Sequence, residues 1–190
     1  MVIQRRRGAV LERALLDAAW EELNENGYAK FTMDGVVRRA GTSPAVLYRR
    51  WSDRSDLVRA AVINVLRESR PETPDTGNVR DDLLGVMKHI ATKNVALVTV
   101  MYAHLASYHQ ETNGSPDDLF DPVESGRQDA LDALFDRAIR RGEIRAEALT
   151  ARIKSLPFAL LRHEILSTFA PVPDQVLEEI VDTIFLPLVQ

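Results

Sequence analysis

The stretch that decides the fold is residues 14–58, ALLDAAWEELNENGYAKFTMDGVVRRAGTSPAVLYRRWSDRSDLV. Its apolar residues recur every three or four positions, which is the spacing of amphipathic helices that each bury one face. Thr32 and Ser43 are suitable helix N-caps, and Gly41 can end a helix. Pro44 can occupy the first position of a helix, where a missing N–H removes no hydrogen bond. These signals predict a helix to about residue 26 and two short helices joined by a tight turn.

Two short helices that meet at a turn form a helix-turn-helix, whose second helix enters the DNA major groove. If Leu47 and Trp51 face the core, a rotation of about 100° per residue turns Ala45 and Arg49 outward. Arginine can bind a guanine edge through two hydrogen bonds, and small apolar groups can contact a thymine methyl. Helix N-termini, hydroxyl groups and other arginines suit phosphates. The motif covers about residues 32–51, and the predicted DNA-binding residues are Thr32, Thr42, Ser43, Pro44, Ala45, Val46, Tyr48, Arg49, Arg50 and Arg54.

The charge distribution favours a nucleic-acid partner for the N-terminal part, although the whole chain has a net charge of −4. Residues 1–70 contain 13 Lys and Arg against 9 Asp and Glu, whereas residues 71–190 contain 11 against 19. A basic N-terminal part on an acidic body fits DNA binding by the former. The alternative is a packed helical module with solvated charges. Its outward face would more often carry Glu, Lys and Gln than Ala, Arg and Tyr.

Composition argues against several other classes of protein. The 190 residues include no cysteine, which excludes disulfides, thiolate metal sites and a cysteine nucleophile. No window approaches the roughly 20 apolar residues of a membrane span, and acidic residues interrupt the basic N-terminus, so we expect a cytoplasmic protein. The four histidines lack the spacing of a helical zinc motif, and no phosphate-binding glycine loop is present. We therefore expect neither an enzyme nor a bound metal or cofactor.

Nearly all of the remaining sequence has helical periodicity. A fourth helix is expected to reach about Ser69, and residues 70–78, with two prolines and a glycine, form the clearest module boundary. No stretch alternates apolar and polar residues in the manner of a strand. The predicted fold class is all-α with about nine helices, in which a three-helix N-terminal helix-turn-helix precedes a helical C-terminal part. Beyond the boundary, the predicted helices are at about residues 80–93, 95–110, 121–141, 146–168 and 174–188.

Residues 14–58 resemble the DNA-binding domain of the tetracycline-repressor (TetR) family. The matching residues are, in order, Leu15, Ala18, Ala19, Gly27, Tyr28, Thr32, Val36, Ala40, Gly41, Ser43, Leu47, Tyr48, Trp51, Asp56 and Leu57. The chain departs from the family at 44–45, where Lys-Gly is common, and at 49–51, where His-Tyr-Phe is common. Arg54 also stands where lysine is common. Because these changes alter the outward face, no operator sequence is carried over from the family.

The resemblance implies a homodimeric transcriptional regulator that binds double-stranded operator DNA, usually a repressor released by a small-molecule effector. It implies a DNA-binding domain at residues 1–56 and an effector-binding and dimerisation domain at residues 57–190. Two alternatives stay open. The first is an effector-independent or activating regulator with the same helix-turn-helix. The second, from a different class, is a helical ligand-binding or scaffold protein that does not bind DNA.

Within the C-terminal domain, the resemblance implies a pocket for an effector that is partly hydrophobic. Aromatic, Met and polar residues at helical spacing are candidates for its lining, although most such residues belong to a plain core. The candidates are Met87, Met101, Tyr102, His104, Leu105, Tyr108, Phe120, Phe135, Phe158, Arg162 and His163.

The last two predicted helices carry wide apolar faces. Two such helices can pair with those of a second subunit as a four-helix bundle, and an intramolecular core is the alternative. The candidate dimer-interface residues are Ile153, Leu160, Ile165, Leu177, Val181, Ile184 and Phe185.

Overall fold

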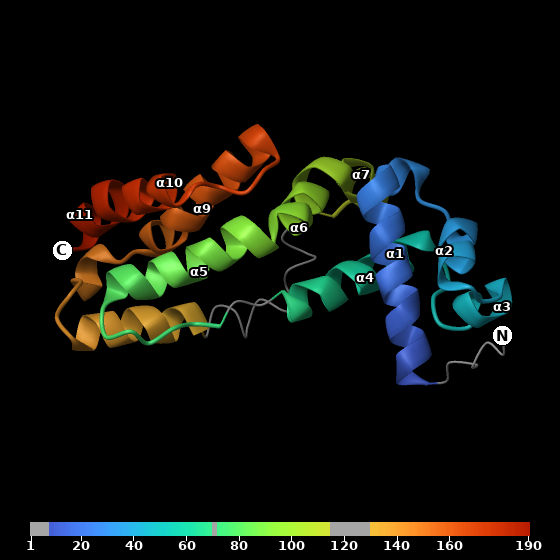
Figure 1. Ribbon diagram of the computed structural model, residues 1–190, viewed down its shortest axis with the longest axis horizontal. Helices are drawn as coiled ribbons and strands as arrows, with labels where there is room; N and C mark the ends of the chain where they lie inside the picture. The colour runs from blue at the N-terminus through green and yellow to red at the C-terminus, as the bar shows by residue number, and fades with distance from the viewer. Residues whose placement is uncertain (1–7, 70–71, 115–129) are drawn as a thin grey trace. The chain divides into compact units, whose positions relative to one another are not determined.

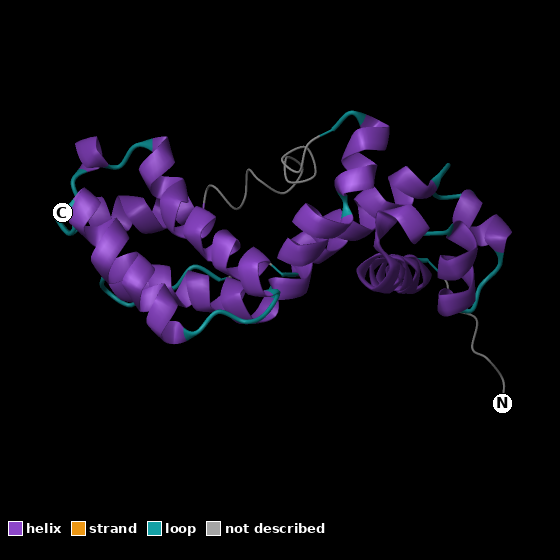
Figure 2. Ribbon diagram, turned by 90° about the horizontal axis from the view of Figure 1, so that it is seen from above, coloured by secondary structure: helices purple, strands orange, loops and turns teal. Residues whose placement is uncertain are grey.

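The protein is known here from a computed structural model, which describes residues 8–69, 72–114 and 130–190. Every regular element in these ranges is a helix and none is a strand (Figure 2), which confirms the predicted all-α class. The chain divides into two compact units, Met1–Glu68 with Val100–Pro122, and Ser69–Thr99 with Val123–Gln190. The predicted division of function after residue 56 stays a prediction, because packing does not report which residues bind DNA or an effector.

The first unit is organised around one long N-terminal helix (Figure 1). Its helices are α1 (Ala9–Lys30), α2 (Met33–Ala40), α3 (Pro44–Tyr48), α4 (Arg54–Glu68), the π-helix η1 (Val100–His104) and α7 (Ala106–Thr112). Helices α2, α4, η1 and α7 all pack against α1, and α3 packs against α2. Helices η1 and α7 therefore pack against the N-terminal helices, although they lie far from them in the sequence.

Buried apolar side chains hold these helices together at the spacing that the sequence predicted. The side chains with no exposed surface include Leu15, Ala19, Leu23, Tyr28, Val36, Leu47, Leu57, Val58, Ala61 and Val62. Gly27 has φ 65° and ψ 169°, a conformation that favours glycine, and it breaks α1. The first helix is therefore interrupted at the glycine where it was predicted to end, and a short helical turn after the break extends α1 to Lys30.

The second unit contains the remaining helices. They are α5 (Val79–Lys93), α6 (Val95–Thr99), a helix at residues 130–140, the 3-10 helix η2 (Ala146–Ala148), α9 (Ala151–Thr168), α10 (Asp174–Glu178), the π-helix η3 (Glu179–Phe185) and α11 (Leu186–Val189). Helices α10, η3 and α11 follow one another without a break, which agrees with the single helix predicted at about residues 174–188. Of the helix predicted at 121–141, residues 121–129 lie outside the described part of the chain.

Side-chain caps set the starts of two of these helices. The Asn78 side chain accepts a hydrogen bond from the Asp81 N–H at 2.8 Å and begins α5. The Thr150 hydroxyl accepts one from the Ile153 N–H at 3.3 Å and begins α9. The helix predicted from residue 146 therefore starts at Ala151, because Thr150 satisfies an orphan donor there and the preceding residues form a separate 3-10 turn.

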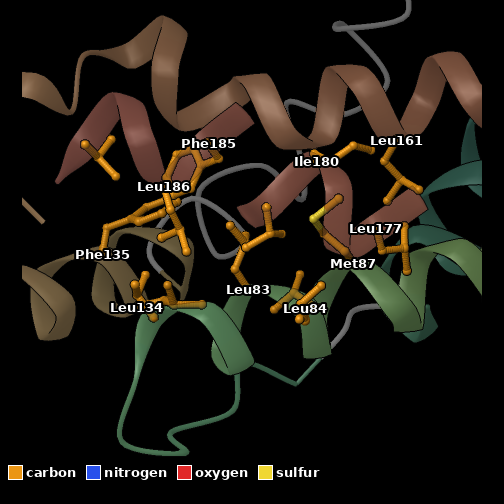
Figure 3. Close-up of a cluster of buried hydrophobic side chains, with 14 of the residues drawn as sticks. Leu83, Leu84, Met87, Leu134, Phe135, Leu161, Leu177, Ile180, Phe185 and Leu186 are labelled. Carbon is orange, nitrogen blue, oxygen red and sulfur yellow. The ribbon is translucent and has the colours of Figure 1, made fainter. Parts of the chain in front are cut away.

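The core of the second unit joins α5, residues 130–140, α9 and the C-terminal helices. Figure 3 shows side chains of all these segments converging. The rings of Phe135 and Phe185 have centroids 5.8 Å apart. Met87 and Phe135, two of the candidate pocket residues, are completely or almost completely buried in this packing.

Four of the seven candidate dimer-interface residues belong to this intramolecular core. Ile165, Leu177, Val181 and Phe185 have no exposed surface within a single chain, so in this conformation their side chains cannot contact a partner. This burial contradicts the prediction that they form the interface, because an apolar stripe wide enough to pair two subunits is also wide enough to pack inside one chain. The other three, Ile153, Leu160 and Ile184, are partly buried.

No single helix in the described ranges is long and apolar enough to cross a membrane. The bent pair Val79–Lys93 and Val95–His104 meets the requirements of length and composition only.

Candidate nucleic-acid interface

Helix α2 begins after Thr32 and ends before Gly41, the two residues that the sequence predicted as its N-cap and its end. The Thr32 hydroxyl accepts a hydrogen bond from the Gly35 N–H at 3.0 Å, which satisfies one of the orphan donors of the first turn. Gly41 has φ 63° at the C-terminal end, where the left-handed conformation favours glycine. The next N–H, that of Thr42, donates to the Val37 carbonyl at 3.2 Å. The turn into α3 is therefore closed by hydrogen bonds rather than left loose.

Helix α3 is short and is anchored by one completely buried side chain, that of Leu47. Ser43 has the extended backbone of an N-cap, but its side chain makes no capping hydrogen bond. Trp51, which we expected to face the core with Leu47, is only half-buried. The helix ends at Tyr48, and a further turn follows in which the N–H groups of Arg50 and Trp51 both donate to the Leu47 carbonyl.

The outward face of α3 carries the residues that helical geometry placed there. Ala45, Tyr48 and Arg49 are exposed, and 52% of the surface of Tyr48 is accessible although it is a large aromatic residue. An exposed tyrosine beside an exposed arginine suits a groove lined by phosphates and base edges. Of the other predicted DNA-binding residues, Thr32, Ser43 and Pro44 are exposed, whereas Thr42, Val46, Arg50 and Arg54 are half-buried.

Arg39 fixes the position of α2 on α1. Its guanidinium lies 3.1 Å from Glu22, 2.7 Å from Glu25 and 3.5 Å from Glu21, all of which are on α1. The hydrogen bond from Arg39 lowers the pKa of Glu25 below its ordinary value. The cluster holds α2 in a fixed orientation on α1, and no local sequence pattern indicates it.

Gly35 allows α2 to approach α1 closely. A Cβ atom at this position would lie 2.2 Å from Oε1 of Glu22 and 2.9 Å from the Thr32 hydroxyl. The clash falls mainly on the flexible end of Glu22, which would have to shift away from Arg39, and Ala is a better helix former than Gly. Gly35→Ala should therefore lower the free energy of unfolding by only about 1 kcal/mol, because the overpacking cost exceeds the helix-propensity gain by about that amount. Urea denaturation followed by circular dichroism measures the change.

The variant Glu22→Ala supplies the control for Gly35→Ala, because it removes the nearest clashing atoms. The double variant should then lose less stability than the sum of the two single variants. A Gly35→Ala protein with the wild-type midpoint of unfolding would show that the contact relaxes without cost.

Arg54, a predicted phosphate contact, already has an acidic partner. Its guanidinium lies 4.4 Å from the centroid of the Tyr28 ring and forms an ion pair with Glu111 of α7. The Tyr28 hydroxyl donates a hydrogen bond to the same carboxylate at 2.8 Å. The pKa of Glu111 is lowered, first by the hydrogen bond from Arg54 and then by that from Tyr28. Burial, followed by the hydrogen bond to Glu111, raises the pKa of Tyr28.

The candidate pocket residues fall into both compact units. In the first unit Met101, Leu105 and Tyr108 are buried, while Tyr102 and His104 are half-buried. Tyr108 packs edge-on against Tyr28, with ring centroids 5.2 Å apart.

In the second unit, Phe158 packs against the core that contains Met87 and Phe135. Arg162 and His163 are exposed. Phe120 lies outside the described residues. The two surface depressions that stand out are lined by none of these candidates: one adjoins the start of α5 and the end of α11, and the other lies between α1 and α4. A shared effector pocket formed by the candidates therefore stays a prediction.

In the described parts of the chain, no group of three or more His, Cys, Asp or Glu side chains is arranged to hold a metal ion.

Known proteins are similar to this chain along nearly its whole length. Residues 15–61 match the family described as bacterial regulatory proteins, tetR family, and residues 73–184 match the tetracyclin repressor-like C-terminal domain. A DNA-binding transcriptional repressor TetR from Mycobacteroides abscessus is 33% identical over 190 residues, which cover 97% of this chain and 96% of the relative. An HTH-type transcriptional regulator from Mycobacterium tuberculosis is 32% identical over 185 residues, which cover 93% of this chain and 86% of the relative.

Solved structures share the fold. The regulator FadR from Bacillus subtilis, in complex with stearoyl-CoA, superposes with a TM-score of 0.72 at 17% identity and covers 91% of this chain and 99% of that one. The fatty acid degradation regulator FadR from Bacillus halodurans gives a TM-score of 0.71 at 17% identity, covering 96% and 97%. At 17% sequence identity, the similarity to these two structures supports a shared fold and nothing further.

Proposed function

Because the chain belongs to the TetR family of bacterial regulatory proteins, we propose that it is a sequence-specific DNA-binding repressor that a small molecule releases from its operator. The observation that carries the proposal is the face of α3 formed by Ala45, Tyr48 and Arg49, exposed on a helix anchored by Leu47. The N-terminus of α2, capped by Thr32, presents backbone N–H groups that suit a phosphate of the same duplex.

A mobility-shift assay with DNA from upstream of the protein's own gene tests this proposal. Retardation of one fragment in preference to others, weakened by rising salt, supports it. Heparin, a phosphate-free polyanion, should compete with DNA if the interface is basic. Failure to bind any genomic fragment at low salt would end the proposal and favour a helical ligand-binding or scaffold protein.

Arg49→Ala should reduce sequence discrimination by about 1–3 kcal/mol if the guanidinium reads a guanine edge through two hydrogen bonds. The side chain is exposed, so the variant should keep its fold. Affinities for the preferred fragment and for an unrelated fragment, measured at one salt concentration, give the discrimination directly. A variant with wild-type discrimination would remove Arg49 from the base-reading set.

We also propose that the functional protein is a homodimer. A dimer presents two copies of α3, which enter successive major grooves when they are about 34–36 Å apart. Because the completely buried residues cannot contact a partner, the interface candidates that remain are the partly buried Ile153, Leu160 and Ile184, of which Ile153 and Leu160 also pack against the core. Sedimentation analysis with the Leu160→Glu variant tests this arrangement, because a charge in an apolar interface should shift the protein towards monomer.

The proposed effector is a partly hydrophobic small molecule that favours a conformation unable to bind DNA. To change occupancy decisively it must bind the two conformations with very different affinities. Thermal-shift measurements with candidate compounds, stearoyl-CoA among them, followed by mobility shift, test this part. Compounds that raise the melting temperature and release DNA support it. DNA binding that no compound affects, together with increased transcription, would favour the effector-independent or activating alternative.

A further inference from the structure

The cluster of Tyr28, Arg54 and Glu111 joins three helices of the first unit at one charged group. Arg54 is the first residue of α4, Tyr28 lies near the end of α1 and Glu111 lies on α7. Glu111 is the only one of the three that carries a negative charge, and both of its neighbours donate hydrogen bonds to it. Its side chain is 44% exposed and that of Arg54 is 38% exposed, so the ion pair lies at the surface.

The position of Arg54 brings this surface close to the predicted DNA contacts. Arg54 lies five positions after Arg49 in the chain, which limits the distance between their backbones to about 18 Å. Tyr28, on which the guanidinium stacks, is four residues before Thr32, a distance of at most about 14 Å. These upper limits keep Arg54 in the same part of the first unit as Arg49 and the N-terminus of α2, the predicted DNA contacts.

We propose that Glu111 is an autoinhibitory acid, which occupies the guanidinium of Arg54 in competition with a DNA phosphate. A carboxylate and a phosphate oxygen use the same donors of an arginine, so Arg54 must leave Glu111 before it binds the backbone. The proposal rests on the proposed DNA binding and adds to it an intramolecular contact that lowers the affinity for DNA. It also links Arg54 to the position of α7, because α7 carries both Glu111 and Tyr108, which packs on Tyr28.

Glu111→Gln tests whether the Glu111–Arg54 ion pair inhibits DNA binding, and it disturbs the fold little. The amide oxygen of glutamine still accepts the Tyr28 hydroxyl, but the charge that holds Arg54 is lost. We expect an affinity for DNA about two- to fivefold higher, on specific and unrelated fragments alike, as for release from an exposed ion pair. The logarithmic salt dependence should become steeper by about 0.9, since one more phosphate is neutralised.

Glu68→Gln is the matched control, because Glu68 pairs with Arg13 at the opposite end of α4 at 2.8 Å. It removes the same charge from the same unit and reports the general effect of charge on DNA binding. In the Arg54→Ala background, Glu111→Gln should no longer change the salt dependence. If circular dichroism shows that Glu111→Gln does not fold, Glu111→Asp, with Glu68→Asp as its control, should give a smaller change in the same direction, because the carboxylate is withdrawn from Arg54 by one methylene group.

The outcomes separate this inference from the proposed function. If wild-type protein binds DNA, and Glu111→Gln binds no better than Glu68→Gln, Glu111 does not inhibit DNA binding, although the DNA-binding function stands. Lower affinity of the folded Glu111→Gln variant also overturns the inference, because Glu111 then supports Arg54 in its DNA-binding position. If no variant and no wild-type protein binds DNA, the proposed function fails and the inference fails with it.

Discussion

A glutamate in place of Ala45 should abolish operator binding, with a loss in affinity of about 100-fold or more, since like charges placed together at an interface cost several kcal/mol. Ala45 is the second residue of α3, and its small side chain is exposed. A carboxylate at this position meets the phosphates and base edges that Arg49, one turn later, is expected to bind. The fold should remain intact, because an acidic residue in the first turn of a helix interacts favourably with the helix dipole.

Asn24→Glu provides the control for this prediction. Asn24 is exposed on α1, outside α2 and α3, and the substitution adds the same charge to the same unit. It should weaken binding far less than Ala45→Glu at the same salt concentration. Thermal unfolding of both variants shows whether the fold is kept. An Ala45→Glu protein that is folded and binds DNA as well as the Asn24→Glu protein would mean that α3 is not the recognition helix.

The helix-turn-helix could be predicted from the sequence because its determinants are local. The cap at Thr32, the left-handed Gly41 and the proline at the start of α3 lie within thirteen residues of one another. The outward position of Ala45 and Arg49 follows from the burial of Leu47 and the helical repeat alone. Each of these features acts over one or two turns, which is the range that a sequence pattern describes.

Contacts between distant segments could not be predicted in the same way. Glu111 pairs with a residue 57 positions away and accepts a hydrogen bond from one 83 positions away, and no local pattern indicates either contact. The sequence predicts that Arg54 is available to bind a phosphate. The ion pair with Glu111 means that Arg54 must leave this partner first. A charged side chain gives no sign of its partner until the chain has folded.

The apolar C-terminal helices were ambiguous for a different reason. Periodicity identifies which residues avoid water but not whether another segment of the same chain or a second subunit covers them. In α9 and the helical segment after it, the chain itself covers Ile165, Leu177 and Phe185 completely. The same limit applies to the candidate effector pocket, since Met87 and Phe135 have the composition of a pocket lining and the packing of a core.

Asp82 is a buried residue that the sequence pattern does not indicate. It lies in the first turn of α5, where acidic residues are usually exposed. It has no exposed surface. Its Oδ1 accepts hydrogen bonds from the Thr76 N–H at 2.6 Å and from the Thr76 hydroxyl at 2.8 Å. Its Oδ2 lies 3.5 Å from Arg141 and 3.9 Å from Arg137. One carboxylate thus ties the segment before α5 to residues that lie near the end of the helix at 130–140.

Asp82→Ala should lower the free energy of unfolding of the second unit by about 1–3 kcal/mol, because the Thr76 N–H and hydroxyl lose their acceptor. Arg137 and Arg141 keep Asp75 as a partner, and Arg141 also keeps Glu143. Asp82→Asn should lose less, because its amide oxygen can still accept from Thr76, although its NH₂ group then faces two guanidinium groups. Asp81→Ala is the matched control: Asp81 is exposed and pairs with Arg80 at 3.3 Å, so its loss should cost less than about 1 kcal/mol. Urea denaturation of the three variants gives the order. An Asp82→Ala protein as stable as Asp81→Ala would show that the arginines and Thr76 find solvent or other partners, and that the buried carboxylate does not hold the segment before α5 in place.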